Sequence, residues 1–205
     1  MTTRPYVCIV GAGPSGLGMS RSLSAHGIDH KIYESHNDIG GLWDEENSGS
    51  PIYNNVNFIS SKCMSAFDGL PMPDSYPDYP TRQMILSYLH LFTARFDLRK
   101  NIQFSTKVCK VHKEGDEWTV KLSDNTIEKF THLVCANGVN WHPNMPQLNG
   151  HFSGDLLHSI AFFDARPFEG KKVLIIGGGN SASDIAHELA GVAARVDISM
   201  RRGYY

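Results

Sequence analysis

The sequence has no long hydrophobic run and almost no net charge. None of its apolar stretches approaches the roughly 20 residues that a membrane-spanning helix needs, and the opening residues, MTTRP, lack the apolar segment of a secretion signal. The 19 Lys and Arg residues against 21 Asp and Glu residues leave a formal charge of −2, which does not favour a polyanionic partner. We therefore expect a cytoplasmic protein with no membrane segment and no nucleic-acid partner.

Cysteines are few and far apart. The four of them, Cys8, Cys63, Cys109 and Cys135, show no CxxC spacing, which argues against a redox pair or a zinc knuckle. We expect them to be reduced and mostly buried. The ten histidines form no cluster with metal-ligand spacing either, so the sequence predicts no metal site.

A glycine-rich turn stands out near the N-terminus. The segment GAGPSG follows the apolar run of residues 6–10 and precedes a helical pattern, and a second strand ends at Glu34. Gly11, Gly13 and Gly16 fit GxGxxG: they allow a tight turn, close approach of a pyrophosphate, and close helix packing. The helix N-terminus offers unpaired N–H groups to the phosphates, and Glu34 would accept hydrogen bonds from ribose hydroxyls. This pattern predicts a dinucleotide site.

A second turn of the same design lies near the C-terminus. Residues 171–191 again read as strand, glycine turn and helix, with GGGNSA at the turn and a further strand at 195–200. The position equivalent to Glu34 is Met200, and Arg201 and Arg202 follow it. Guanidinium groups suit a ribose 2′-phosphate, which a carboxylate would repel. We interpret the first site as one for FAD and the second as one for NADPH.

The remaining segments give the domain organisation. Residues 81–96 have helical spacing, residues 102–131 alternate in the pattern of three antiparallel strands, and Gly, Asn, Ser, Asp and Pro predict loops over 40–80. We expect an α/β protein with a Rossmann-like FAD-binding domain at 1–150 that carries a three-stranded antiparallel meander. The linker motif and the first βαβ part of a second Rossmann-like, NADP-binding domain follow at 151–205.

The linker makes the interpretation specific. Residues 151–162 hold the pattern FxGxxxHxxx[YF], and the chain also contains GGLW, SSK followed by FDGLPMP, and CANG. In these motifs the chain resembles the flavin-containing monooxygenase family over nearly its whole length. The resemblance implies cofactor-binding residues Gly11, Gly13, Pro14, Ser15, Gly16, Glu34, Gly41, Leu42, Trp43, Ser61 and Val108 for FAD, and Gly177, Gly179, Asn180, Ser181, Arg201 and Arg202 for NADPH. It also implies a role for His158 at the nicotinamide cofactor or in orienting the domains.

The resemblance implies a reaction as well. In that family NADPH reduces the flavin, O₂ then forms a flavin hydroperoxide, and an oxygen atom passes to a nitrogen- or sulfur-containing small molecule. The family's Asn before the two serines is Ile59 here, and Asn57 would stand on the same side of an extended segment. We therefore count Asn57, Ile59 and His158 as the candidate catalytic residues.

Three alternatives remain open at this point. Ile59 favours an NADPH oxidase that releases peroxide, whereas the short length favours a non-catalytic nucleotide-binding fragment. A disulfide reductase would need a cysteine pair near the flavin, which the sequence lacks. Because family members are about twice as long, the chain is interpreted as a piece of a longer polypeptide or as a remnant, to be completed by a missing C-terminal half or by a second copy.

Overall fold

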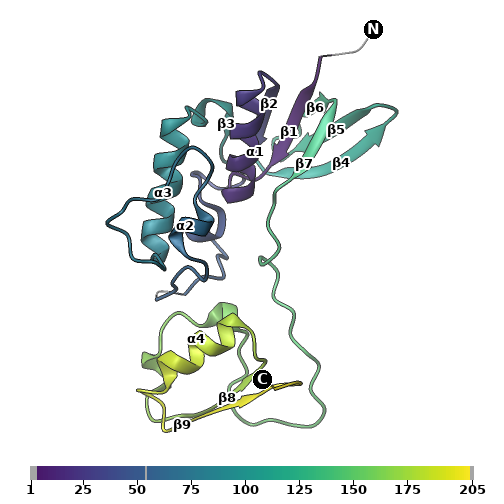
Figure 1. Ribbon diagram of the computed structural model, residues 1–205. Coiled ribbons are helices and arrows are strands. Elements are labelled where there is room, and N and C mark those ends of the chain that lie inside the picture. The colour runs from purple at the N-terminus through teal and green to yellow at the C-terminus, as the bar shows by residue number, and fades with distance from the viewer. Residues whose placement is uncertain (1–3, 54, 204–205) are drawn as a thin grey trace. The chain divides into compact units, whose positions relative to one another are not determined.

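The computed structural model (Figure 1) describes residues 4–53 and 55–203. The chain divides into two compact units. Unit 1 consists of residues 1–50 and 57–139, and unit 2 of residues 51–56 and 140–205. The predicted domain boundary near residue 150 stays a prediction.

A parallel sheet forms the centre of unit 1. Its strands are β1 (Tyr6–Val10), β2 (Asp29–Tyr33), β3 (Ile102–Gln103) and β7 (His132–Cys135), in the order β3-β2-β1-β7. Because successive side chains of a strand point to opposite faces, neighbouring residues of β1 enter different cores. Ile9 belongs to the first core and Cys8 to the second.

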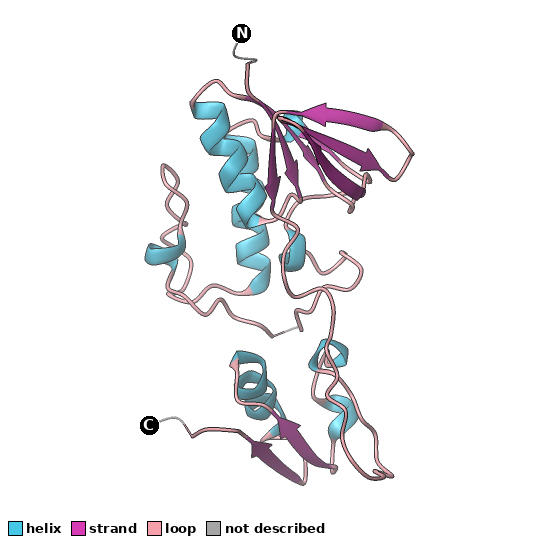
Figure 2. Cartoon of the chain, turned by 90° about the vertical axis from the view of Figure 1, so that its right-hand side faces the viewer, coloured by secondary structure: helices cyan, strands magenta, loops and turns pink. Residues whose placement is uncertain are grey.

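Two helices cover one face of this sheet (Figure 2). They are α1 (Pro14–Ala25) and α3 (Arg82–Arg95), and both contribute to the first core. Thr81 caps α3 by accepting a hydrogen bond from the Met84 N–H at 3.4 Å, as short hydroxyl side chains do at helix N-termini. The helix predicted over 81–96 is thereby confirmed.

The antiparallel meander packs on the opposite face. It consists of β4 (Val108–Glu114), β5 (Glu117–Leu122) and β6 (Ile127–Phe130), joined by turns in which Gly115 and Asn125 have positive φ. The three predicted antiparallel strands are confirmed, but the prediction that they begin at residue 102 is wrong. Residues 102 and 103 pair in parallel with β2, because the Ile102 side chain packs against the first core.

The loops predicted over residues 40–80 contain two short helical turns, η1 (Gly41–Trp43) and α2 (Lys62–Ser65). A further turn, η2 (Arg99–Asn101), leads into β3. The expectation that the cysteines are mostly buried is wrong. Only Cys8 is buried, where burial raises the pKa of its thiol to about 12, while the other three are exposed.

Unit 2 has the predicted strand, glycine turn, helix and strand. These are β8 (Lys172–Ile176), α4 (Asn180–Leu189) and β9 (Arg195–Ser199), preceded by the turns η3 (Ser159–Ala161) and η4 (Arg166–Phe168). The strands β8 and β9 are parallel, so their carboxyl ends lie at one edge. The two units together confirm the predicted α/β class with Rossmann-like βαβ parts and a meander.

No helix of residues 4–53 and 55–203 combines the length and hydropathy needed to cross a membrane.

Candidate functional site

The first glycine turn is shaped by two glycines that the fold itself requires. Gly11 has a φ of +103°, and a Cβ atom there would stand 2.5 Å from the Ala136 carbonyl oxygen. A Cβ atom at Gly16 would stand 1.9 Å from the Gly11 carbonyl oxygen. Both contacts are closer than any real side chain tolerates, so these two glycines are needed for folding whether or not a ligand binds.

Gly13 is different, because no contact among the described residues requires a glycine there. Its φ is −75°, and the nearest atom to a Cβ would be the Gly41 Cα at an ordinary 3.7 Å. Gly13 is the N-cap of α1, and no described side chain caps that helix end, while Pro14 and Ser15 form its first turn. A ligand that approaches the backbone closely explains the glycine. The turn therefore fits a dinucleotide pyrophosphate.

The structure brings Glu34 to this turn. The carboxylate is buried at the end of β2, where its Oε2 accepts a hydrogen bond from the Ala12 N–H at 2.7 Å. Its Oε1 accepts from the His36 N–H at 2.8 Å and from the Ser35 hydroxyl at 3.2 Å. These donors hold the carboxylate beside the glycine turn, in the place where ribose hydroxyls of a bound dinucleotide are recognised.

A second loop packs against the same turn. The Gly40 N–H donates to the Ala12 carbonyl at 3.2 Å, and Gly41, at a φ of +60°, lies directly against Gly13. Leu42 and Trp43 follow in η1, and the Trp43 ring meets the Phe58 ring edge to face at 5.3 Å. Residues from both loops that the resemblance assigns to FAD are thus gathered at one place.

Two further predicted residues lie in neighbouring segments. Val108 is half-buried and is the first residue of β4. The nearby Thr106 N–H donates a hydrogen bond to the Glu34 carbonyl at 2.8 Å, which connects this strand to the residue predicted to bind ribose. Ser61 is the N-cap of α2. Their roles toward FAD stay predictions.

The candidate catalytic segment is exposed. Asn57 pairs with Thr81 in an isolated bridge, and 67% of the Ile59 surface is accessible. The chain bends at residues 59 and 60, so the extended geometry that would place Asn57 on the same side as Ile59 ends before Ile59. Catalytic roles for these two residues stay predictions.

The second glycine turn is open. Gly177 has a φ of +124° and donates its N–H to the Ser199 carbonyl at 2.9 Å, while Gly179 is the N-cap of α4 at an unstrained φ of −86°. No described atom lies within 4 Å of a Cβ built on either glycine. Asn180 and Ser181 are exposed in the first turn of α4. This open cradle suits a second dinucleotide.

The two arginines lie at the same edge of unit 2 as the second glycine turn. Arg201 and Arg202 are exposed and follow β9, whose Ser199 is the register partner of Ile176 at the end of β8. The glycine turn and the arginines are therefore neighbours along the carboxyl ends of two parallel strands, where open α/β sheets bind their ligands.

His158 has a structural task in unit 2. It is the N-cap of η3, where its Nδ1 accepts a hydrogen bond from the Ile160 N–H at 3.1 Å. The motif around it also has packing reasons: the Phe152 ring lies over Gly154, and Phe162 is buried in the unit 2 core. A contact of His158 with the nicotinamide cofactor stays a prediction.

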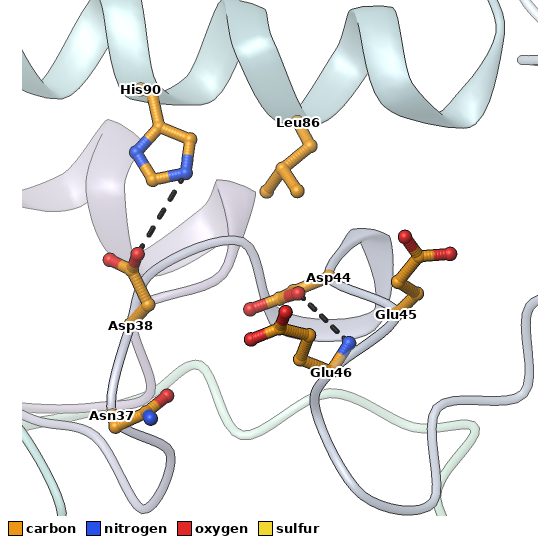
Figure 3. Close-up of a pocket in the computed structure, with 7 residues that line it drawn as sticks. All are labelled: Asn37, Asp38, Asp44, Glu45, Glu46, Leu86 and His90. Carbon is orange, nitrogen blue, oxygen red and sulfur yellow. Dashed lines mark hydrogen bonds and ion pairs between the residues drawn. The ribbon is translucent and has the colours of Figure 1, made fainter.

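An acidic pocket beside α3 is not the phosphate site (Figure 3). Its lining is Asn37, Asp38, Asp44, Glu45, Glu46, Leu86 and His90. Four carboxylates would repel a pyrophosphate, and several are already engaged: Asp38 pairs with Arg99 at 2.8 Å, and Asp44 with His36 at 3.0 Å. Within the described residues, no group of three or more His, Cys, Asp or Glu side chains is placed to hold a metal ion.

Two glycine turns, each between a strand and a helix, together with the meander define the class of the fold, which is that of flavin monooxygenases with Rossmann-like parts. The model of the flavin-binding monooxygenase-like family matches residues 4–205, and the chain belongs to that family. The cofactors predicted from the sequence, FAD and NADPH, are the family's cofactors.

Similar proteins agree with this membership. The chain is 37% identical to dimethylaniline monooxygenase [N-oxide-forming] 2 of Oryctolagus cuniculus over 96% of its length and 40% of the relative's. A flavin-containing monooxygenase from Stenotrophomonas maltophilia matches with a TM-score of 0.86 and 27% identity, over 97% of this chain and 58% of that one. S-allyl-L-cysteine S-oxygenase from Allium sativum matches with a TM-score of 0.84 and 27% identity, over 98% and 52%. The chain thus spans less than half the length of its curated relative.

Proposed function

We propose that this chain forms the FAD site and the opening part of the NADPH site of a monooxygenase that oxygenates a nitrogen or sulfur atom of a small molecule. Gly13 carries the proposal, because the fold gives no reason for glycine at that position while a closely approaching pyrophosphate does. Relatives described as N-oxide-forming and as an S-oxygenase support the substrate class.

Each group of residues has a task in this proposal. The α1 N-terminus and the Gly11–Gly16 turn hold the FAD pyrophosphate, and Glu34 holds a ribose. The Gly177–Gly179 turn and the arginines after β9 hold NADPH. When bound, FAD accepts hydride from NADPH and activates O₂ for transfer of one oxygen atom. The chain's own contribution is to bind, to orient and to exclude water.

Visible absorbance of the purified protein provides the first test. We expect a flavin spectrum that NADPH bleaches without air and that O₂ restores. An N- or S-containing nucleophile should then yield an oxygenated product in proportion to the NADPH consumed. A protein that contains no flavin, and takes up none when FAD is added, would contradict the proposal.

A second candidate, an NADPH oxidase that releases peroxide, is favoured by Ile59. Its exposed aliphatic side chain excludes some water but offers no hydrogen bond to a polar group on the flavin. A missing hydrogen bond of this kind costs roughly 1–3 kcal/mol, which would make peroxide release about fivefold to a hundredfold more competitive with oxygen transfer.

Ile59→Asn is therefore expected to lower the peroxide formed per NADPH consumed in the presence of a soft nucleophile. The position is exposed, so the stability should change by less than about 0.5 kcal/mol. Ile127→Asn, at an equally exposed isoleucine on β6, is the matched control and should leave the ratio unchanged. Tight coupling of the unmutated enzyme would show that position 59 is not limiting.

A further inference from the structure

The short segment 51–56 belongs to unit 2, although the chain on both sides of it belongs to unit 1. Tyr53, in this segment, is buried, with 4% of its surface accessible. The Tyr53 ring meets Phe162 edge to face at 5.9 Å, and Val56 packs against the same core. Tyr53 and Val56 are therefore part of the packing of unit 2.

The Tyr53 hydroxyl donates a hydrogen bond to the Asp184 carboxylate on α4. Burial, and then the Asp184 and Glu188 carboxylates, raise the pKa of Tyr53 well above its ordinary value. The phenol is thus kept protonated as a donor. A hydrogen bond to a charged group is among the stronger ones in proteins.

Asp184 is an unexpected residue for its helix. The α4 N-terminus is the proposed anion-binding end, and a carboxylate five residues after Gly179 opposes a bound phosphate through space. The contact with Tyr53 fixes this carboxylate toward segment 51–56 and partly offsets its charge. Helix α4 thereby tolerates an acid that ties the segment down.

We propose that Tyr53 and Asp184 form an anchor that couples the NADPH site to segment 51–56. Tyr53 is a positioning residue. Its hydrogen bond to Asp184 holds in place the segment that leads directly into Asn57. This inference rests on the proposed NADPH site at the second glycine turn. Because binding linkage is reciprocal, NADP⁺ should tighten the anchor, and a broken anchor should weaken the binding of NADP⁺.

Chymotrypsin cleavage after residue 53 measures how often the anchor opens, since opened segments are cut in proportion to their population. Tyr53→Phe keeps the cleavage site and removes only the hydroxyl. We expect about tenfold to a hundredfold faster cleavage in this variant, as the loss of a hydrogen bond to a charged group implies. Cleavage after Phe152, which is exposed in the wild-type protein, is the internal control and should not change.

The ligand dependence distinguishes coupling from simple packing. In the wild type, saturating NADP⁺ should slow cleavage after Tyr53, and this protection should disappear in Tyr53→Phe and Asp184→Ala. Asp184→Asn keeps an acceptor oxygen and should retain the protection by NADP⁺. Faster cleavage in Tyr53→Phe with an unchanged NADP⁺ dissociation constant would overturn the coupling. Failure of the wild type to bind NADP⁺ would instead overturn the proposed function, and the cleavage rates without ligand would still test the anchor.

Discussion

Gly13→Ala is expected to weaken FAD binding while the chain stays folded. The backbone at position 13 suits any L-residue, and a methyl group there would make only an ordinary contact with Gly41. A bound pyrophosphate would have to occupy the same space, and overpacking of this kind costs roughly 1–3 kcal/mol. We therefore expect FAD to bind about fivefold to a hundredfold more weakly. Flavin absorbance per protein after dialysis measures the loss, and thermal unfolding of the flavin-free protein measures the fold.

Two other glycines make this experiment decisive. Gly191→Ala adds a methyl group at a position with no positive φ and no atom within 4 Å, so it should retain flavin and stability. Gly16→Ala adds a methyl group 1.9 Å from a backbone oxygen and should lower the melting temperature even without flavin. A Gly13→Ala protein with as much flavin as the wild type would mean that the turn does not hold the pyrophosphate.

The sequence predicts the glycine turns well because their determinants are local. The Gly11–Gly16 pattern fixes a tight turn and a helix start within a few residues. Glu34 is placed by the strand that follows, and parallel pairing of β1 with β2 carries it to Ala12. The sequence pattern assigns the turn and Glu34 to one dinucleotide site, and the structure adds the hydrogen bond that joins them, from the Ala12 N–H to a carboxylate 22 residues away.

Contacts between segments far apart in the sequence are not indicated by a local sequence pattern. Nothing near Tyr53 in the sequence indicates that this residue packs with α4, the helix of the second glycine turn, and Asp184 does not by itself indicate Tyr53 as its partner. The alternation of apolar and polar residues assigns Ile102 to the meander, although tertiary packing places it in the parallel sheet. In each case the partner is supplied by the fold, and strand and loop propensities depend on such context.

Arg201→Ala is expected to reduce the preference of the enzyme for NADPH over NADH. The Gly177 N–H donates to the Ser199 carbonyl, so the glycine turn and the residues after β9 are adjacent at one edge of unit 2. Met200 stands where the first site has its ribose acid, which leaves a 2′-phosphate unopposed by a carboxylate. A charge-assisted hydrogen bond is worth roughly 1.5–3 kcal/mol, or about tenfold to a hundredfold in the ratio of the two cofactors.

Arg195→Ala is the matched control, because Arg195 opens β9 at the opposite end of the strand and pairs with Asp197 at 2.7 Å. It removes the same charge at the other end of β9 from the residues that follow the strand and should leave the preference unchanged. Binding of 2′,5′-ADP and of 5′-AMP by calorimetry reads the 2′-phosphate contact without turnover: Arg201→Ala should weaken only the first. Arg201→Lys keeps the charge but loses the paired donors of a guanidinium. Its affinity for 2′,5′-ADP should therefore lie between that of the wild type and that of Arg201→Ala. Equal binding of both nucleotides by the wild type would show that the residues after β9 do not recognise a 2′-phosphate.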